Sequence, residues 1–133
     1  MNIKLYPSVT FLSALLIATA CADTNNSPTK FDTLNCIGTE PFWSLDLKDS
    51  TITFEDLDSI KTNFRLSKAE VSSNHTNRWF ITAIGKKSEE SLSISLIKTN
   101  MCSDDMSDFN YEYDMTTSIN GTQVLSGCCN RMM

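Results

Sequence analysis

Residues 91–96 read Ser-Leu-Ser-Ile-Ser-Leu, an alternation of serine with branched aliphatic side chains. Successive side chains of a β-strand point to opposite faces, so this pattern indicates a strand with one face in a core and the other in water. Residues 79–84, Trp-Phe-Ile-Thr-Ala-Ile, carry large apolar side chains on both faces. They predict a strand that is covered on both sides.

The same period-two pattern continues in both directions along the chain. Further strands are predicted around residues 43–47, 51–54, 111–115 and 122–126, and a weaker pattern covers 64–71. Turn residues separate them, including the hairpin signal Asn120-Gly121. Only residues 55–62 could form a helical turn, which is too short to cover a sheet. We therefore expect an all-β fold, a small antiparallel β-barrel or half-barrel of six to eight strands.

Composition limits the size and the partners of the protein. The chain has 133 residues, 41% hydrophobic and 20% charged, which is typical of one small globular domain. Its net charge of −5 argues against nucleic acid as the main partner, because phosphate binding needs a cationic surface.

The first twenty residues are typical of a signal peptide. One positive residue, Lys4, precedes an apolar stretch at 9–20 that is too short to span a membrane. The sequence Ala18-Thr19-Ala20-Cys21 resembles a bacterial lipobox, with Ala18 where leucine is usual, and implies that Cys21 is lipidated. Several acyl chains would then hold the protein on a membrane. The alternative is plain secretion, with cleavage after Ala20 or Ala22.

The resemblance also implies a place in the cell envelope. Residue 22 is Ala and not Asp, which in enteric-type bacteria implies the outer membrane, with the protein facing the periplasm. Residues 21–33 are polar and predict a flexible tether, and residues 34–133 predict the single all-β domain. Loss of residues 1–20 would remove Lys4 and leave a net charge of −6.

Two segments carry unusual residues: the first is 36–45, and the second runs from 101–108 through 111–113 to 127–129. They resemble an uncharacterised family of small bacterial envelope proteins, often lipoproteins, with the motifs G-T-E-P-F-W-S, C-S-D-G-M-S-D, an aromatic Y-x-Y strand, and G-C-C or G-C-A. Residues 38–44 and 127–129 match fully, and residues 102–108 match except at Asp105, where the family has glycine. The resemblance implies an envelope protein and supplies no catalytic assignment.

The predicted domain contains four cysteines: Cys36, Cys102, Cys128 and Cys129. Export to an oxidising compartment predicts two disulfides. Because adjacent cysteines rarely pair, two connectivities are open: Cys102–Cys128 with Cys36–Cys129, or the swapped partners. A four-cysteine zinc site is disfavoured because no Cys-x₂-Cys spacing occurs, and the same absence argues against catalytic thiol exchange.

The remaining candidate residues suggest a pocket. A semi-buried Glu40 beside large aromatic side chains could bind a small ligand, and three nearby carboxylates could bind a cation, although their spacing does not match an EF-hand loop. The structural alternatives are that Trp43 fills the barrel end, that Glu40 accepts backbone N–H groups of the 102–108 loop, and that the acidic loop is a solvated turn capped by Ser103 and Ser107. The candidate pocket residues are Glu40, Phe42, Trp43, Asp104, Asp105 and Asp108.

Enzyme chemistry is not expected. His75, the single histidine, lies in the polar stretch 72–77, so an exposed side chain is predicted and no catalytic residue, metal or cofactor is assigned. The sequence favours a non-enzymatic envelope lipoprotein that acts as a binding or interaction module, with an envelope protein as one candidate partner and no prediction of oligomeric state. Two alternatives are a periplasmic inhibitor of a cationic hydrolase such as lysozyme, which the negative charge suits, and a small-ligand or cation-binding domain.

Overall fold

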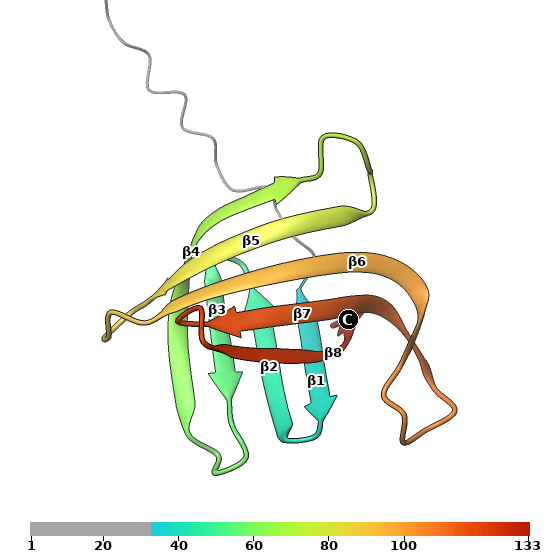
Figure 1. Cartoon of the computed structure of the whole chain (residues 1–133), viewed down its shortest axis with the longest axis horizontal. Helices are drawn as coiled ribbons and strands as arrows, with labels where there is room; N and C mark the ends of the chain where they lie inside the picture. Colours follow the sequence, from blue (N-terminus) through green and yellow to red (C-terminus); the bar gives the residue numbers. More distant parts are fainter. Residues whose placement is uncertain (1–32) are drawn as a thin grey trace, which may run out of the picture.

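The computed structural model describes residues 33–133, in which eight antiparallel strands close into one barrel in chain order (Figure 1). The predicted all-β antiparallel barrel is confirmed. The predicted signal peptide (1–20), Cys21 and all of the tether except Thr33 lie outside the described residues. The strands are β1 (Leu34–Thr39), β2 (Phe42–Lys48), β3 (Thr51–Glu55), β4 (Lys61–Val71), β5 (Arg78–Gly85), β6 (Ser91–Ser103), β7 (Asn110–Ile119) and β8 (Gln123–Arg131).

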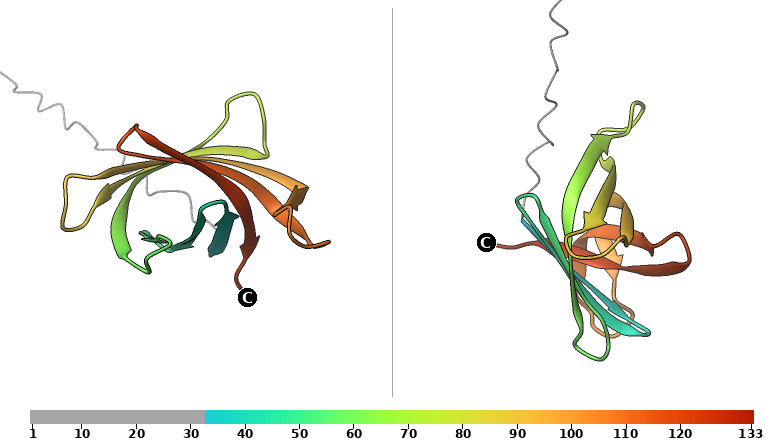
Figure 2. Two further views of the ribbon diagram at one scale, coloured as in Figure 1. Left: turned by 60° about the horizontal axis from the view of Figure 1, so that its bottom comes forward. Right: turned by 90° about the vertical axis from the view of Figure 1, so that its left-hand side faces the viewer.

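The barrel is flattened into two layers of strands that cross one another (Figure 2). β1, β2 and β3 form one layer, β5 to β8 form the other, and β4 bends from the first into the second. The bend in β4 coincides with a register irregularity between Leu66 and Lys68. A bulge of this kind kinks a strand and increases its twist, which a small closed barrel requires.

Alternation places one apolar row of each strand inside the barrel. Leu92, Ile94 and Leu96 on β6 are buried, as their spacing predicted, while the intervening serines face outward. The interior also holds Trp43, Phe54 and Phe64, so side chains fill the barrel. Among residues 33–133 there is no helix of the length and apolar character needed to cross a membrane.

The seam that closes the barrel is short. β1 and β8, the first and last strands, pair only from Leu34 opposite Arg131 to Ile37 opposite Cys128. One further backbone bond extends the seam, because the Met132 N–H donates to the Thr33 carbonyl (2.7 Å). Closure of the barrel thus joins the two ends of the domain through few residue pairs.

Three details differ from the sequence-based expectations. β1 was not predicted as a strand, because Gly38 and Pro41 interrupt its pattern. Residues 56–60 form a turn and no helix, since the Asp56 carboxylate accepts the N–H groups of Asp58 and Ile60. The prediction that the strand at 79–84 is covered on both sides is wrong, because Phe80 is 56% and Ile84 50% exposed.

The hairpin predicted at Asn120-Gly121 is confirmed. Both residues have positive φ (54° and 67°), as expected for a tight turn between right-twisted strands.

Candidate functional site

The most distinctive part of the molecule is the outer half of the β6–β7 hairpin, residues 99–112, which we call the distal ribbon. The β6–β7 ladder is interrupted between Lys98 and Cys102. At this interruption Asn100 has a φ of 55°, and the Met101 N–H donates to Thr99 Oγ1 (3.2 Å). This irregularity allows the ribbon to leave the barrel wall and lie against β8 and β1.

An ion-pair cluster holds the base of the distal ribbon. The Arg131 guanidinium donates from Nε to both carboxylate oxygens of Glu112 (3.2 and 2.9 Å), and Lys98 Nζ lies 3.9 Å from the same carboxylate. The bond to Arg131 is the main cause of the lowered pKa of Glu112. Lys98 also lies over the Tyr113 ring, 5.7 Å from its centroid. The ribbon is therefore joined to the end of β8 at its base.

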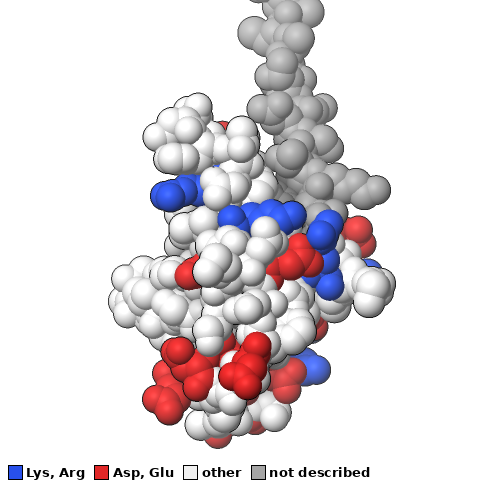
Figure 3. All heavy atoms as spheres, turned by 90° about the vertical axis from the view of Figure 1, so that its right-hand side faces the viewer, with Lys and Arg blue, Asp and Glu red and all other residues white. Residues whose placement is uncertain are grey.

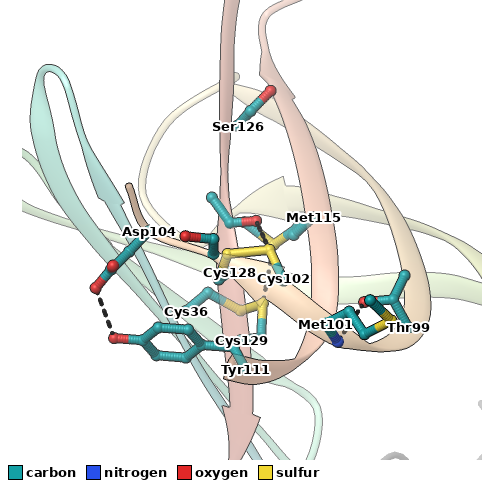
Figure 4. The surroundings of a disulfide bond; sticks show 12 residues. Cys36, Thr99, Met101, Cys102, Asp104, Tyr111, Met115, Ser126, Cys128 and Cys129 are labelled. Carbon is teal, nitrogen blue, oxygen red and sulfur yellow. Dashed lines mark hydrogen bonds between the residues drawn. A yellow bond between two sulfur atoms is a disulfide. The ribbon is translucent and has the colours of Figure 1, made fainter. Parts of the chain in front are cut away.

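Two disulfides lie side by side at this end of the barrel (Figure 4). Cys36 and Cys129 are opposite residues of β1 and β8 and are bonded inside the barrel, where Cys129 Sγ lies 3.7 Å from Met115 Sδ. Cys102 on the distal ribbon is bonded to Cys128. Of the two connectivities left open by the sequence, the structure thus has Cys36–Cys129 with Cys102–Cys128.

The adjacent positions of Cys128 and Cys129 on β8 explain this disulfide connectivity. Cys129 points into the barrel and Cys128 points outward, because adjacent side chains alternate. Cys128 is nevertheless buried, since the distal ribbon covers it. Only a cysteine arriving from outside can reach Cys128, and Cys102 is carried there by the ribbon.

Asp104 organises the tip of the distal ribbon. Its Oδ1 accepts the N–H groups of Met106 (3.1 Å) and Ser107 (2.9 Å), and its Oδ2 accepts the Tyr111 hydroxyl (3.1 Å). The Ser103 and Ser107 hydroxyls cap further turn amides, accepting the N–H groups of Asp105 and Phe109 respectively. The capped turn expected from the two serines is therefore confirmed.

These bonds shift the two titrating groups in opposite directions. The backbone N–H groups of Ser107 and then Met106 lower the pKa of Asp104 below its ordinary value of 3.8. Burial, followed by the bond to Asp104, raises the pKa of Tyr111 above 10.0. Because the ionised carboxylate is favoured in the folded ribbon, its contribution is present above pH 3.8 and is lost as pH falls through the lower folded pKa.

We therefore expect the tip of the ribbon to stay ordered down to a pH below 3.8. In an NMR titration, the amide signals of Met106 and Ser107 should shift together with a midpoint below 3.8, the ordinary pKa of the group. In Asp104→Ala the same amides should lose their protection at neutral pH, while the amides of β2 and β3 stay unchanged. A midpoint at or above the ordinary value would contradict this account.

A small crevice separates the distal ribbon from the barrel. It has a volume of about 170 Å³ and is lined by the backbone of Gly38 and Gly127 and by Asp104, Asp105 and Asp114. Thr39 Oγ1 donates to the Asp104 carbonyl across it (3.4 Å). On this side of the molecule, acidic side chains gather at the lower end and basic side chains lie above them (Figure 3).

The predicted aromatic pocket residues separate in the structure. Trp43 is buried, stacks on Phe54 (centroids 6.0 Å apart) and fills the barrel end, as the structural alternative proposed. Phe42 is exposed next to the tip of the β1–β2 hairpin. Glu40 is exposed rather than semi-buried, at a cis peptide bond to Pro41. The β1–β2 hairpin bonds to the acidic loop at 102–108 through Thr39, and not through Glu40 as the structural alternative had it.

Gly38 and Gly127 have one shared role. A Cβ on Gly38 would lie 2.0 Å from Trp43 Nε1, and a Cβ on Gly127 would lie 2.8 Å from Trp43 Cζ2. The indole therefore packs directly on both glycines. This contact joins the segments 38–44 and 127–129 physically, and it gives a packing reason for Gly38, Trp43 and Gly127 to occur together.

Of the three predicted acidic residues, one is bonded within the distal ribbon and two are exposed. Asp104 has both of its oxygens occupied within the ribbon, whereas Asp105 and Asp108 are exposed. Asp105 has a φ of 58°, a left-handed conformation that glycine adopts most readily. His75 is exposed on the β4–β5 loop, as predicted. Within residues 33–133, no three His, Cys, Asp or Glu side chains are grouped so as to hold a metal ion.

No protein-family model, curated protein or solved structure matches this chain.

Proposed function

We propose that this protein is a non-enzymatic binding module of the bacterial cell envelope, lipid-anchored through Cys21, which presents the tip of the distal ribbon to a basic protein partner. The lipobox resemblance and the similarity to small envelope proteins support the anchor and the location. The two disulfides support export, because such bonds persist mainly in oxidising compartments.

The observation that carries the proposal is the bracing of an exposed loop. The distal ribbon is fixed at its base by the Glu112–Arg131 bond, in its middle by Cys102–Cys128, and at its tip by the bonds of Asp104. A loop that is ordered before binding loses less conformational entropy when a partner docks. The bracing therefore suits recognition of a protein surface.

The side chains at the tip define the chemistry of the partner. Met101 is 78% exposed, and Met106 and Phe109 are also exposed, so the ribbon offers apolar anchors to a docking protein. The exposed carboxylates of Asp105 and Asp108 lie among them. Methionine and aromatic side chains are enriched in protein interfaces, and acidic groups at their rim favour a basic partner.

Two alternatives belong to the same site. A protruding acidic loop also suits an inhibitor that enters the basic cleft of a cationic hydrolase, such as lysozyme. A small-ligand or cation site would lie in the crevice beside Asp105 and Asp114. The occupied oxygens of Asp104 make this second alternative the weaker one.

The binding test uses a matched pair of charge reversals. Asp105→Lys with Asp108→Lys should lower the affinity for a basic envelope protein at least ten-fold, which is about 1.4 kcal/mol. Glu89→Lys with Glu90→Lys makes the same change of net charge on the β5–β6 hairpin, at the other end of β6, and should change the affinity less than two-fold.

The first binding probe is purified lysozyme, measured by calorimetry and by its lytic activity. Tight binding with loss of lytic activity would select the inhibitor alternative, and binding of a different basic envelope protein without inhibition would select the main proposal. Equal losses in the two charge-reversed variants would mean that net charge alone governs binding and would contradict a role for the distal ribbon.

The anchor is tested separately by the intact mass of the protein purified from its native membrane. We expect an acylated Cys21 at the N-terminus and, on reduction, a mass gain of four hydrogens from the two disulfides. An unmodified chain cleaved after Ala20 or Ala22 would show plain secretion and would overturn the lipoprotein assignment.

A further inference from the structure

The outer face of the β5–β8 layer carries rows of uncharged side chains, whereas the distal ribbon is acidic. One row crosses four neighbouring strands through directly paired residues: Thr82 on β5, Ser93 on β6, Ser118 on β7 and Val124 on β8. Thr82, Ser93 and Ser118 face outward, because their strand neighbours on either side are buried in the barrel. Val124 is itself 63% exposed and precedes the buried Leu125.

A second row runs parallel to the first. It consists of Phe80, Ser95, Thr116 and Ser126, which are again paired from strand to strand. We call the two rows together the neutral face. None of its residues is ionisable, although 20% of the residues of the chain are charged. Phe80 and Val124 are exposed at its two borders, and the exposure of Phe80 is part of what contradicted the predicted covered strand.

Charge restricts what can dock on this face. The chain has a net charge of −5, so two copies repel one another unless they meet where carboxylates are absent. On the neutral face no such repulsion arises. Its hydroxyl groups are both donors and acceptors, so two identical rows can satisfy one another across a two-fold axis, which rows of carboxylates or ammonium groups cannot do.

The border of the neutral face adds complementary charges. The next paired row beyond Phe80 and Ser95 contains Arg78 on β5, Ile97 on β6 and Asp114 on β7. A two-fold axis along β6 would set Arg78 of each copy opposite Asp114 of the other. On the other side of Thr82 and Phe80, β4 carries Lys68 and Glu70, which form an ion pair with each other (2.9 Å) and would face Val124 and Ser126 of the second copy under this symmetry. The contact therefore has an uncharged centre and brings no like charges opposite one another.

From these observations we infer that the neutral face is the docking surface for a second copy of this chain. The two sheets would pack face to face with small hydroxyl side chains at the centre and Phe80 and Val124 as apolar anchors. Four strands at about 4.8 Å spacing and six residues at about 3.4 Å rise give a footprint on the order of 400 Å² per copy. This is below the roughly 800 Å² per partner of a stable complex, so we expect a dimer that dissociates readily.

Photo-crosslinking in cells that produce the full chain tests the inference, because it traps a dissociable dimer. The crosslinker p-benzoylphenylalanine would replace Phe80 or Val124 in a chain that carries one of two affinity tags. Its control position is Ile60, which lies on the β3–β4 loop and matches Val124 in exposure (61% against 63%). We expect a product of twice the chain mass that carries both tags from positions 80 and 124, and none from position 60.

A charge placed on the neutral face should abolish the product. Ser95→Asp introduces a carboxylate at the centre of the second row and should lower the yield of the doubled product at least ten-fold. Asn63→Asp introduces the same charge at an exposed position of β4, outside the neutral face, and should leave the yield unchanged. Matching thermal unfolding curves for the two variants would establish that both fold.

Three outcomes would overturn the inference. They are the absence of any product from positions 80 and 124, a product that contains another protein or a glycan without a second copy, and equal loss of the product in Ser95→Asp and Asn63→Asp. Each is separable from the binding role of the distal ribbon, because that role is tested with other variants and another partner.

Discussion

Replacing Cys36 and Cys129 together by alanine is expected to lower the free energy of unfolding by about 5 kcal/mol and to leave little closed barrel at 37 °C. This disulfide crosses the seam between β1 and β8, and its sequence separation is 93 residues. In the chain-entropy model, a closed loop of this length stabilises by about 4.7 kcal/mol, a large part of the roughly 5–15 kcal/mol of a small domain.

The second disulfide provides the matched control. Cys102 and Cys128 are separated by 26 residues, which corresponds to about 3.6 kcal/mol in the same model. Cys102→Ala with Cys128→Ala should therefore cost less, and hydrogen exchange should increase mainly in the distal ribbon while the interior strands stay protected. Denaturant unfolding of both double variants measures the two losses. A larger loss from removing Cys102–Cys128 would contradict the assignment of Cys36–Cys129 as the bond that keeps the barrel closed.

Gly127→Ala is expected to cost about 3 kcal/mol or more, or to prevent folding. A Cβ at this position would lie 2.1 Å from the Ile37 carbonyl oxygen and 2.8 Å from Trp43 Cζ2. The first contact is with backbone, which cannot rotate away, so β8 would have to move away from β1 at the end of the seam. Overpacking of a core usually costs about 1–3 kcal/mol, and a collision with backbone belongs at or above the upper end.

Gly121→Ala separates steric collision from backbone strain. Gly121 has a φ of 67°, but a Cβ there meets no atom within 4 Å. The substitution should cost only the roughly 1–2 kcal/mol of a left-handed conformation in a residue with a Cβ. Denaturant unfolding of Gly127→Ala and Gly121→Ala, each with both disulfides intact, measures the difference in the free energy of unfolding. If the two substitutions cost the same, the close packing of Trp43 on Gly127 would not be what makes that glycine necessary.

Alternation along the chain determined the fold class and most of the strands. Leu92, Ile94 and Leu96 predicted the interior row of β6, and Asn120-Gly121 predicted the last hairpin. These signals are local, because a strand and a tight turn each depend on residues a few positions apart. β1 was missed because its glycine, followed shortly by a proline, lowers strand propensity, and its place is fixed by pairing with β8 at the other end of the domain.

Partners across the barrel could not be read from local patterns. Cys128 and Cys129 point to opposite faces of β8, but the sequence does not say which strand lies beside each face. The structure assigns Cys129 to Cys36 through the seam and Cys128 to Cys102 through the bend of the distal ribbon. Trp43 likewise predicted a filled barrel end, while its packing on Gly38 and Gly127 required three strands to meet.

The candidate site shows the same division. Local sequence was enough to predict that the loop around Asp104 is acidic and capped by serines, because hydrogen bonds within a turn join residues two or three positions apart. Three other features follow from the folded barrel and not from local sequence: Glu40 is exposed, the loop is braced against the barrel, and the uncharged side chains of β5 to β8 form one continuous face. Those features depend on strand register and on the bend of β6, which are set by packing between residues far apart in the chain.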